Sequence, residues 1–285
     1  MVKSCTLHKA AHRPAVNARP AFQRAFFKLA KSGSPLHPAV FMSFRCYSRW
    51  LGCFTLMSSS LSAESPSPGK LVPGSATVKN DSGGTSSMGY WTYLPKAEKP
   101  ASGWPLLVFL HGSGERGTDL ELVKKHGPPK LAGQKPVLES FFMIAPQCPM
   151  ERWWDTVAVK DLIEKTMVSQ PIDPKRIYIT GISMGGYATW NLLKEAPKLM
   201  AAAVPICGGG DPASAERFKS VPIWAFHGDK DTAVPVQRSI DMVDALKKEK
   251  SGIRFTLYPG VTHDCWTQTF ENPELYSWLL EQQQK

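Results

Sequence analysis

Hydrophobic positions beyond residue 88 follow two patterns that alternate along the chain. Short continuous apolar runs are typical of strands covered on both faces, and segments with apolar residues every three or four positions are typical of helices. The runs predict strands at residues 89–94, 105–110, 141–145, 176–180, 201–206, 222–226 and 253–258. The amphipathic segments predict helices at residues 157–168, 184–195, 236–248 and 273–282. This alternation predicts an α/β fold with a mostly parallel central sheet and helices on both faces.

The chain before residue 88 has a different character. Residues 64–87 are rich in Ser, Gly and Pro, and we interpret them as a linker or an edge hairpin. Residues 1–63 show no sustained periodicity and are interpreted as a leader. Residues 88–285 form the predicted globular domain.

Charge is unevenly distributed along the 285 residues, which carry a formal net charge of +10. The leader holds nine basic and no acidic residues, whereas the rest holds 25 basic and 24 acidic residues. A nucleic-acid-binding domain needs a basic face on its folded part, so we expect no nucleic-acid partner. No apolar run approaches the roughly 20 residues of a membrane-spanning helix, so we expect no stable membrane insertion.

The leader has two targeting interpretations. From Met42 onward it resembles a secretory signal, with Arg45 and Arg49 ahead of a short apolar core and small residues ending at Ala63. This predicts a secreted or periplasmic protein. Alternatives are an organellar transit peptide around residues 21–29, a disordered tail, and lipid attachment at Cys53.

Cysteine usage points to no metal or disulfide framework. Three of the six cysteines lie in the leader, and Cys148, Cys207 and Cys265 lie in the domain. Three cysteines allow at most one disulfide, and a Cys148–Cys207 pair stays open. The chain has no Cys/His cluster at zinc spacing, so we expect no metal and no cofactor.

Parallel sheets bring the ends of their strands together, and four such ends carry reactive residues. The turn Gly181-Ile182-Ser183-Met184-Gly185 follows a predicted strand and precedes a predicted helix. This is the pattern of a nucleophile elbow, in which flanking glycines permit a tight turn and expose the serine hydroxyl. The alternative is a glycine-rich turn with an idle serine. We predict that Ser183 is the nucleophile.

A serine nucleophile needs a base and a carboxylate. His263 follows the last predicted strand and is the favoured base, with His111, His227 and His126 as alternatives. Asp231 follows the strand at residues 222–226 and is the favoured carboxylate, with Asp229 and Asp264 as alternatives.

The oxyanion formed during acyl transfer needs two N–H donors. We expect one from Met184, directly after the nucleophile. The other is expected from the loop after residue 110, on Ser113 or, next, on Gly114.

At this point the chain resembles a known family. Residues 88–283 are similar to the secreted esterase-like hydrolases of the α/β-hydrolase superfamily, variously called phospholipase/carboxylesterase-like, predicted peptidases or polyhydroxyalkanoate-depolymerase-like proteins. The resemblance rests on short motifs, which are Tyr93–Pro95, Pro105–Gly117, His126–Pro129, Ala145–Pro149, Arg176–Gly186, His227–Pro235 and His263–Trp266. It implies an α/β-hydrolase fold and a Ser183–His263–Asp231 triad.

The domain has no long apolar insertion between residues 195 and 222 that could form a lid. This favours small or polysaccharide-borne esters over bulk lipid. His126, Trp154 and Trp266 lie on loops near the predicted mouth and are candidates for substrate binding, with Trp153 beside them. For the tryptophans, burial in a satellite core is the alternative.

Three hypotheses follow. The first is a serine esterase that acts through an acyl-enzyme. The second is a serine peptidase with the same triad. The third is a non-catalytic binding protein on a hydrolase fold. The natural substrate and the oligomeric state stay undetermined by the sequence.

Overall fold

A computed structural model describes residues 67–284, which form one eight-stranded sheet with flanking helices. The strands are β1 (Leu71–Lys79), β2 (Thr85–Tyr93), β3 (Trp104–Leu110), β4 (Phe142–Pro146), β5 (Ile172–Ile182), β6 (Ala202–Ile206), β7 (Trp224–Gly228) and β8 (Arg254–Tyr258). The α-helices are α1 (Gly127–Leu131), α2 (Thr156–Ser169), α3 (Met184–Glu195), α4 (Gln237–Lys248), α5 (Trp266–Glu271) and α6 (Pro273–Glu281). The predicted α/β fold class is confirmed.

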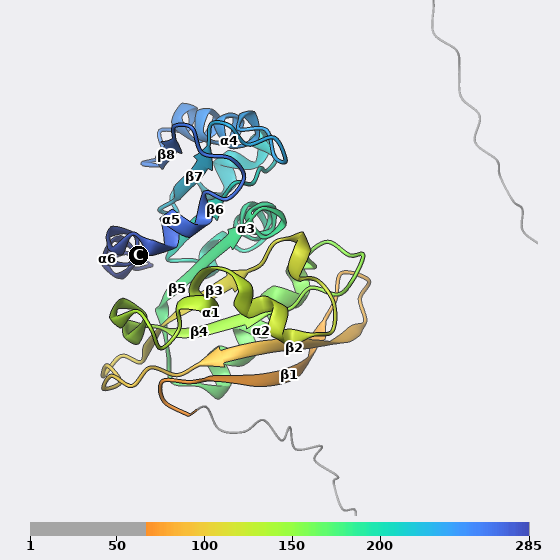
Figure 1. Cartoon of the computed structure of the whole chain (residues 1–285), viewed down its shortest axis with the longest axis vertical. Coiled ribbons are helices and arrows are strands. Elements are labelled where there is room, and N and C mark those ends of the chain that lie inside the picture. Colours follow the sequence, from red (N-terminus) through yellow and green to blue (C-terminus); the bar gives the residue numbers. More distant parts are fainter. Residues whose placement is uncertain (1–66, 285) are drawn as a thin grey trace, which may run out of the picture. The chain divides into compact units, whose positions relative to one another are not determined.

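The sheet is parallel from β4 to β8 and antiparallel at its beginning. Its strand order is β1-β2-β4-β3-β5-β6-β7-β8, with β1 and β2 forming a hairpin that pairs antiparallel with β4. Figure 1 shows this hairpin at one edge of the sheet and β8 at the other. Because β3 and β5 to β8 run in the same direction, the loops that follow them emerge at one edge of the sheet.

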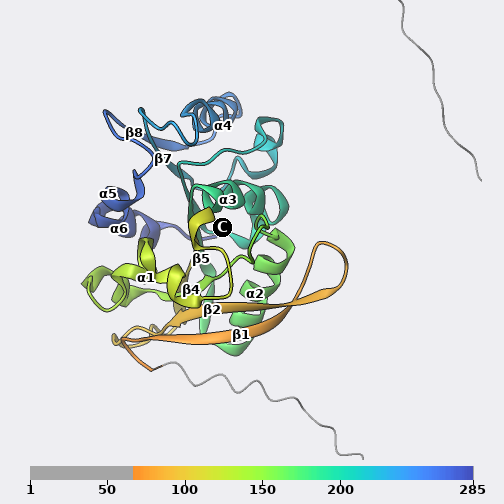
Figure 2. The same ribbon diagram turned by 45° about the vertical axis from the view of Figure 1, so that its right-hand side comes forward.

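Each face of the sheet carries its own hydrophobic core. Leu106, Val108 and Leu110 of β3 face a core that includes residues of α2, α3 and α4. The alternate residues Leu107 and Phe109 face the second core, with residues of α5 and α6. Figure 2 shows these two sets of helices on opposite sides of the sheet. Burial on both faces explains why the central strands read as continuous apolar runs.

The described part of residues 64–87 belongs mainly to the β1–β2 hairpin. From Leu71 onward this segment is strand β1, which pairs along its length with β2, and the chain turns at residues 80–84. Asp161 of α2 anchors the hairpin, because its carboxylate accepts the Lys79 N–H at 2.9 Å and pairs with Lys165. The sheet therefore begins well before residue 88.

The targeting predictions for residues 1–63, including Met42 and Cys53, lie outside the described residues. Within residues 67–284, the helices all fall short of the length and apolar character needed to cross a bilayer. Oligomeric state is not addressed by a single chain.

Candidate active site

Ser183 occupies a strained turn between β5 and α3. Its backbone lies at φ 52° and ψ −115°, a region that residues with a side chain seldom adopt. The turn is tight because its glycines touch backbone: a Cβ on Gly185 would collide with the Leu110 carbonyl oxygen, and one on Gly181 with Gly185. Strain of this kind persists only where the surroundings enforce it, and it concentrates at functional sites.

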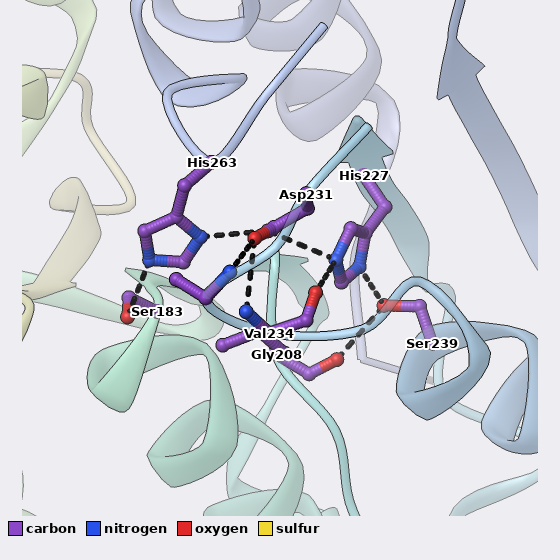
Figure 3. A network of polar contacts seen from close by, with 8 residues as sticks. Ser183, Gly208, His227, Asp231, Val234, Ser239 and His263 are labelled. Atoms are coloured by element: carbon purple, nitrogen blue, oxygen red, sulfur yellow. Dashed lines mark hydrogen bonds and ion pairs between the residues drawn. The ribbon is translucent and has the colours of Figure 1, made fainter. Parts of the chain in front are cut away.

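His263 lies in the loop after β8, and its side chain contacts Ser183, which directly follows β5. Its Nε2 lies 2.9 Å from Ser183 Oγ, and its Nδ1 lies 2.6 Å from Asp231 Oδ2. Figure 3 shows this continuous chain of contacts from the hydroxyl through the imidazole to the carboxylate. The three side chains come from the loops after β5, β7 and β8, as the sequence predicted.

The Asp231 carboxylate is 8% exposed and fully hydrogen-bonded. Its Oδ1 accepts the backbone N–H groups of Ala233 and Val234, both at 2.9 Å. Burial alone would raise the pKa of Asp231, but the hydrogen bond from His263 and these backbone donors hold that pKa below its usual value. Asp231 is therefore a carboxylate at neutral pH, as an orienting partner for an imidazole must be.

A second imidazole contacts the other side of Asp231. His227 is completely buried, with Nε2 2.9 Å from the Val234 carbonyl oxygen and 3.2 Å from Asp231 Oδ2. Its Nδ1 lies 2.7 Å from the Ser239 hydroxyl (Figure 3). Burial lowers the pKa of His227, so the ring is neutral. The Ser239 hydroxyl donates in turn to the Gly208 carbonyl oxygen at 2.8 Å.

The alternative acids and bases serve other purposes. Asp229 accepts the Gly260 N–H at 2.6 Å, and Asp264 caps α5 by accepting the Thr267 N–H at 3.0 Å. His111 Nε2 accepts the Cys148 N–H at 3.0 Å, and its Nδ1 lies 2.6 Å from the Gly112 carbonyl oxygen. These side chains brace loops and are not free to take a proton from Ser183.

The loop after β3 lies against Ser183. A Cβ added to Gly112 would sit 3.6 Å from Ser183 Cβ, and the 3-10 helix η1 (Ser113–Glu115) follows directly. Within residues 67–284, no hydrogen bond uses the N–H of Ser113 or of Met184. Both donors are therefore available, next to the hydroxyl, for an oxyanion.

The three candidate substrate-binding residues have different environments. Trp154 is 8% exposed, donates its indole N–H to the His111 carbonyl oxygen at 3.1 Å and packs on the His111 ring. It supports the loop after β3 and also lines the same pocket as Trp153, so its role in substrate binding stays a prediction. Trp266 lies between His126 and His263, with ring centroids 5.4 and 5.2 Å away. Trp266 therefore packs against the His263 imidazole, and His126 packs on the other side of Trp266.

Two residues beside the site, Glu115 and Tyr187, were not singled out from the sequence. Glu115 is 4% exposed, and its carboxylate lies 3.6 Å from His126 Nε2. Tyr187 lies one helical turn after Ser183 and packs edge-on against Trp153, which is 67% exposed. Of the two adjacent tryptophans, Trp153 faces outward and Trp154 is buried, a difference that residue type alone does not reveal.

The cysteines of the described residues are all free thiols. Cys207 is the one that nears the site, with its sulfur, an Asp231 oxygen and a His263 nitrogen within 4.8 Å of one another. Burial, together with a hydrogen bond to the Cys265 thiol, raises the pKa of Cys207 well above its usual value. This disfavours the thiolate that metal binding requires, and the other two groups already bond to each other.

Comparison with known proteins gives related hydrolases. The model of the dienelactone hydrolase family matches residues 144–273, slightly under half of the chain. A solved thermostable esterase is 39% identical with a TM-score of 0.65, over 73% of this chain and 62% of that one.

Two curated relatives are also esterases. The bifunctional acetylxylan esterase/xylanase XynS20E of Neocallimastix patriciarum is 29% identical over 153 residues, which are 51% of this chain and 22% of that protein. Acyl-protein thioesterase 1 of Cryptococcus neoformans is 26% identical over 222 residues, which cover 61% of this chain and 91% of the relative. The chain thus spans under a quarter of the first relative and most of the second.

Proposed function

Because this chain is a member of the α/β-hydrolase superfamily, we propose that it hydrolyses carboxylic esters through an acyl-enzyme formed on Ser183. One observation carries the proposal: the chain of hydrogen bonds from Ser183 Oγ through His263 to Asp231, with the serine held on a strained turn. A structural serine would need neither the strained backbone nor an imidazole oriented by a buried carboxylate.

Acylation begins when Ser183 Oγ attacks the ester carbonyl carbon. His263 Nε2 takes the hydroxyl proton as the Oγ–C bond forms, and Asp231 stabilises the resulting imidazolium through Nδ1–H. The carbonyl oxygen becomes an anion that the N–H groups of Ser113 and Met184 stabilise. When the intermediate collapses, the C–O bond to the alcohol breaks and the alcohol leaves with the proton from His263.

Deacylation repeats these steps with water as the nucleophile. His263 Nε2 takes a proton from water while the oxygen bonds to the acyl carbon, and the same donors hold the second oxyanion. The bond to Ser183 Oγ then breaks, the serine recovers its proton from His263, and the carboxylic acid is released. His263 relays the proton in both halves of this scheme.

The proposed substrates are small or polysaccharide-borne esters. In the described residues, the connection between β6 and β7 contains only the 3-10 helix η5 (Pro212–Phe218), with no apolar lid over the site. An acetylxylan esterase/xylanase among the relatives supports an ester carried by a polysaccharide. The basic, acid-free leader supports a secreted or periplasmic location, where polysaccharides would be reached.

The test is hydrolysis of p-nitrophenyl acetate and butyrate by the full chain, with Ser183→Ala beside it. We expect kcat/KM to fall at least about 10³-fold in the variant, because the nucleophile is lost. The thermal midpoint should stay nearly unchanged, since the hydroxyl makes only the bond to His263. Ser220→Ala, on an exposed turn, is the matched control and should keep wild-type turnover.

Labelling with a fluorophosphonate separates the remaining alternatives. Covalent labelling of wild type but not of Ser183→Ala, together with ester turnover, supports the esterase. Labelling with turnover of peptide amides only would instead support a peptidase. Substantial ester turnover by Ser183→Ala would overturn the assignment of the nucleophile.

A further inference from the structure

A groove separate from the triad lies between the β1–β2 hairpin and the segment that leads into α2. Its volume is about 240 Å³. Hydroxyl and amide groups of the hairpin line one side, among them Asn80, Ser82 and Ser86, and Trp153 lies on the other. The two sides are tied together, because the Asp81 N–H donates to Asp155 Oδ2 at 3.0 Å.

Residues that line this groove also bond to the loop after β3, which carries the proposed oxyanion donor Ser113 and is called the oxyanion loop below. Gln147 and Cys148 line the groove, and Gln147 Nε2 donates to the carbonyl oxygen of Glu115 at 2.9 Å. The Cys148 N–H donates to His111 at 3.0 Å. Arg116 of the oxyanion loop reaches back to the Arg152 carbonyl oxygen at 3.3 Å. Gln147 and Cys148 thus connect the groove to the oxyanion loop.

Trp153 joins the groove to the nucleophile. Its ring is 67% exposed and contacts the Tyr187 ring edge-on, with centroids 6.0 Å apart. The Tyr187 N–H in turn donates to the Ser183 carbonyl oxygen at 3.1 Å. A single exposed tryptophan needs no explanation by itself. This one lies between a groove of mixed lining and Tyr187, in the first turn of the helix that follows Ser183.

The chemistry of the groove suits a neutral, hydroxyl-rich ring. A flat indole packs against the C–H face of a ring, while hydroxyl and amide groups bond to its substituents. The charged lining residues are one Arg152 and one Asp155, and both Asp155 oxygens already accept backbone N–H groups. This balance disfavours a phosphorylated or strongly charged ligand. The volume lies below the roughly 300–1,000 Å³ of pockets that enclose whole ligands, so one ring unit of a longer chain fits.

We propose that this groove is a glycan subsite, in which a sugar ring of a neutral polysaccharide packs on Trp153 while an ester on a nearby unit reaches Ser183. The proposal rests on the esterase function and specifies its substrate class. It divides the site into two parts, with Trp153 and the hairpin on the side of the nucleophile helix, and His126 and Trp266 on the side of the imidazole.

Binding is measured without catalysis, using full-length Ser183→Ala and calorimetry with xylohexaose, mannohexaose and cellohexaose. We expect at least one of these neutral oligosaccharides to bind, and Trp153→Ala in the same background to weaken that binding at least tenfold. Trp153→Phe keeps an aromatic face and should restore part of the affinity. Val168→Ala removes an exposed hydrophobic side chain of α2 outside the groove and serves as the matched control.

A kinetic comparison gives the second readout. With Ser183 present, Trp153→Ala should lower the ratio of kcat/KM on acetylated xylan to kcat/KM on p-nitrophenyl acetate at least tenfold, through KM. Trp153 is mostly exposed, so its truncation should leave the thermal midpoint near that of the wild type.

The outcomes separate the two proposals. Trp153-dependent binding of an oligosaccharide supports the subsite even if ester turnover fails. Ester turnover without binding of any of the three oligosaccharides overturns the subsite and leaves the esterase intact. Equal affinity in Trp153→Ala and its parent also overturns it, as does Trp153-dependent binding of ferulate or a neutral peptide in place of the sugars.

Discussion

At the scale of single residues, Asp231 has the most demanding task. One oxygen accepts two backbone N–H groups, and the other contacts the rings of both His263 and His227. This arrangement fixes the His263 tautomer, with the proton on Nδ1 and a free Nε2 lone pair facing Ser183. The base is therefore ready before substrate arrives.

Asp231→Asn tests this role. An amide has one oxygen and one NH2, so if its oxygen faces the backbone donors of Ala233 and Val234, its NH2 faces His263 Nδ1. The imidazole must then carry its proton on Nε2, where it cannot accept the serine proton. We expect kcat for p-nitrophenyl acetate to fall about 10⁴-fold, the loss known for the same change in another serine hydrolase triad.

The matched control is Asp229→Asn, which alters a neighbouring aspartate bonded to the Gly260 amide. It should keep kcat within about threefold of wild type. Equal losses in the two variants would contradict the assignment of Asp231.

The meeting of Ser183, His263 and Asp231 could be predicted because each follows a strand in the parallel part of the sheet. The direction of neighbouring side chains could not. Trp153 and Trp154 are consecutive and chemically identical, yet one faces outward and the other packs on His111. The contact between His227 and Asp231 was missed for a related reason, because it depends on how the loop between them folds back.

At the scale of elements, the close approach of α3 to the strand ends is what holds the nucleophile. A Cβ on Gly185 would collide with the Leu110 carbonyl oxygen, and one on Gly186 with that of Ile206. These are backbone atoms of β3 and β6, which cannot move without disturbing the sheet. The glycines therefore set how near the helix approaches both strands.

Gly185→Ala should consequently destabilise the fold by about 3 kcal/mol, the cost of forcing extra volume into a packed interior. Denaturant unfolding followed by tryptophan fluorescence measures this. Gly252→Ala adds the same methyl group where no atom lies within 4 Å, and it should change stability by less than about 0.5 kcal/mol. A similar small change for Gly185→Ala would contradict the packing argument.

Element boundaries could be predicted best where both faces are buried. The helix predicted at residues 184–195 has those bounds, and β3 begins one residue before its predicted start. Strand β1 could not be assigned with certainty, because it buries one face only, through small residues such as Val72, Ala76 and Val78. Its remaining positions are half-buried or exposed and include Pro, Gly, Ser, Thr and Lys, so they resemble a linker. Helix α5 has six residues, too few for a periodic pattern.

At the scale of the whole molecule, buried neutral histidines couple stability to pH. His111 is completely buried, its Nδ1 donates to the Gly112 carbonyl oxygen, and its Nε2 accepts the Cys148 N–H. Protonation of Nε2 would place its new N–H against the Cys148 N–H, so that two donors would face each other without an acceptor. Burial, chiefly, lowers the pKa of His111 to about 4.

The sign of the effect follows from proton uptake. Between pH ~6.5 and ~4 the unfolded chain binds a proton at this histidine and the folded chain does not, so the free energy of unfolding falls as pH decreases. We expect a loss of about 3 kcal/mol from His111 across this window, from the shift in its pKa. Buried His227 acts in the same direction.

His111→Gln carries no titrating ring, so its stability should depend less steeply on pH in this window, even if it is lower at pH 7. Urea unfolding at pH 4.5, 5.5, 6.5 and 7.5 for both proteins gives the two slopes. Parallel slopes would exclude His111 as the source of the acid sensitivity.

The placement of the three proposed catalytic groups also decides which strands must be folded before the molecule can catalyse ester hydrolysis. Ser183, Asp231 and His263 follow β5, β7 and β8, and β8 is the edge strand of the sheet. A chain whose β8 has not yet paired holds the proposed nucleophile and carboxylate without the proposed base. Esterase activity would then require the edge strand β8 to be in place, and copies that lack this pairing would be inert.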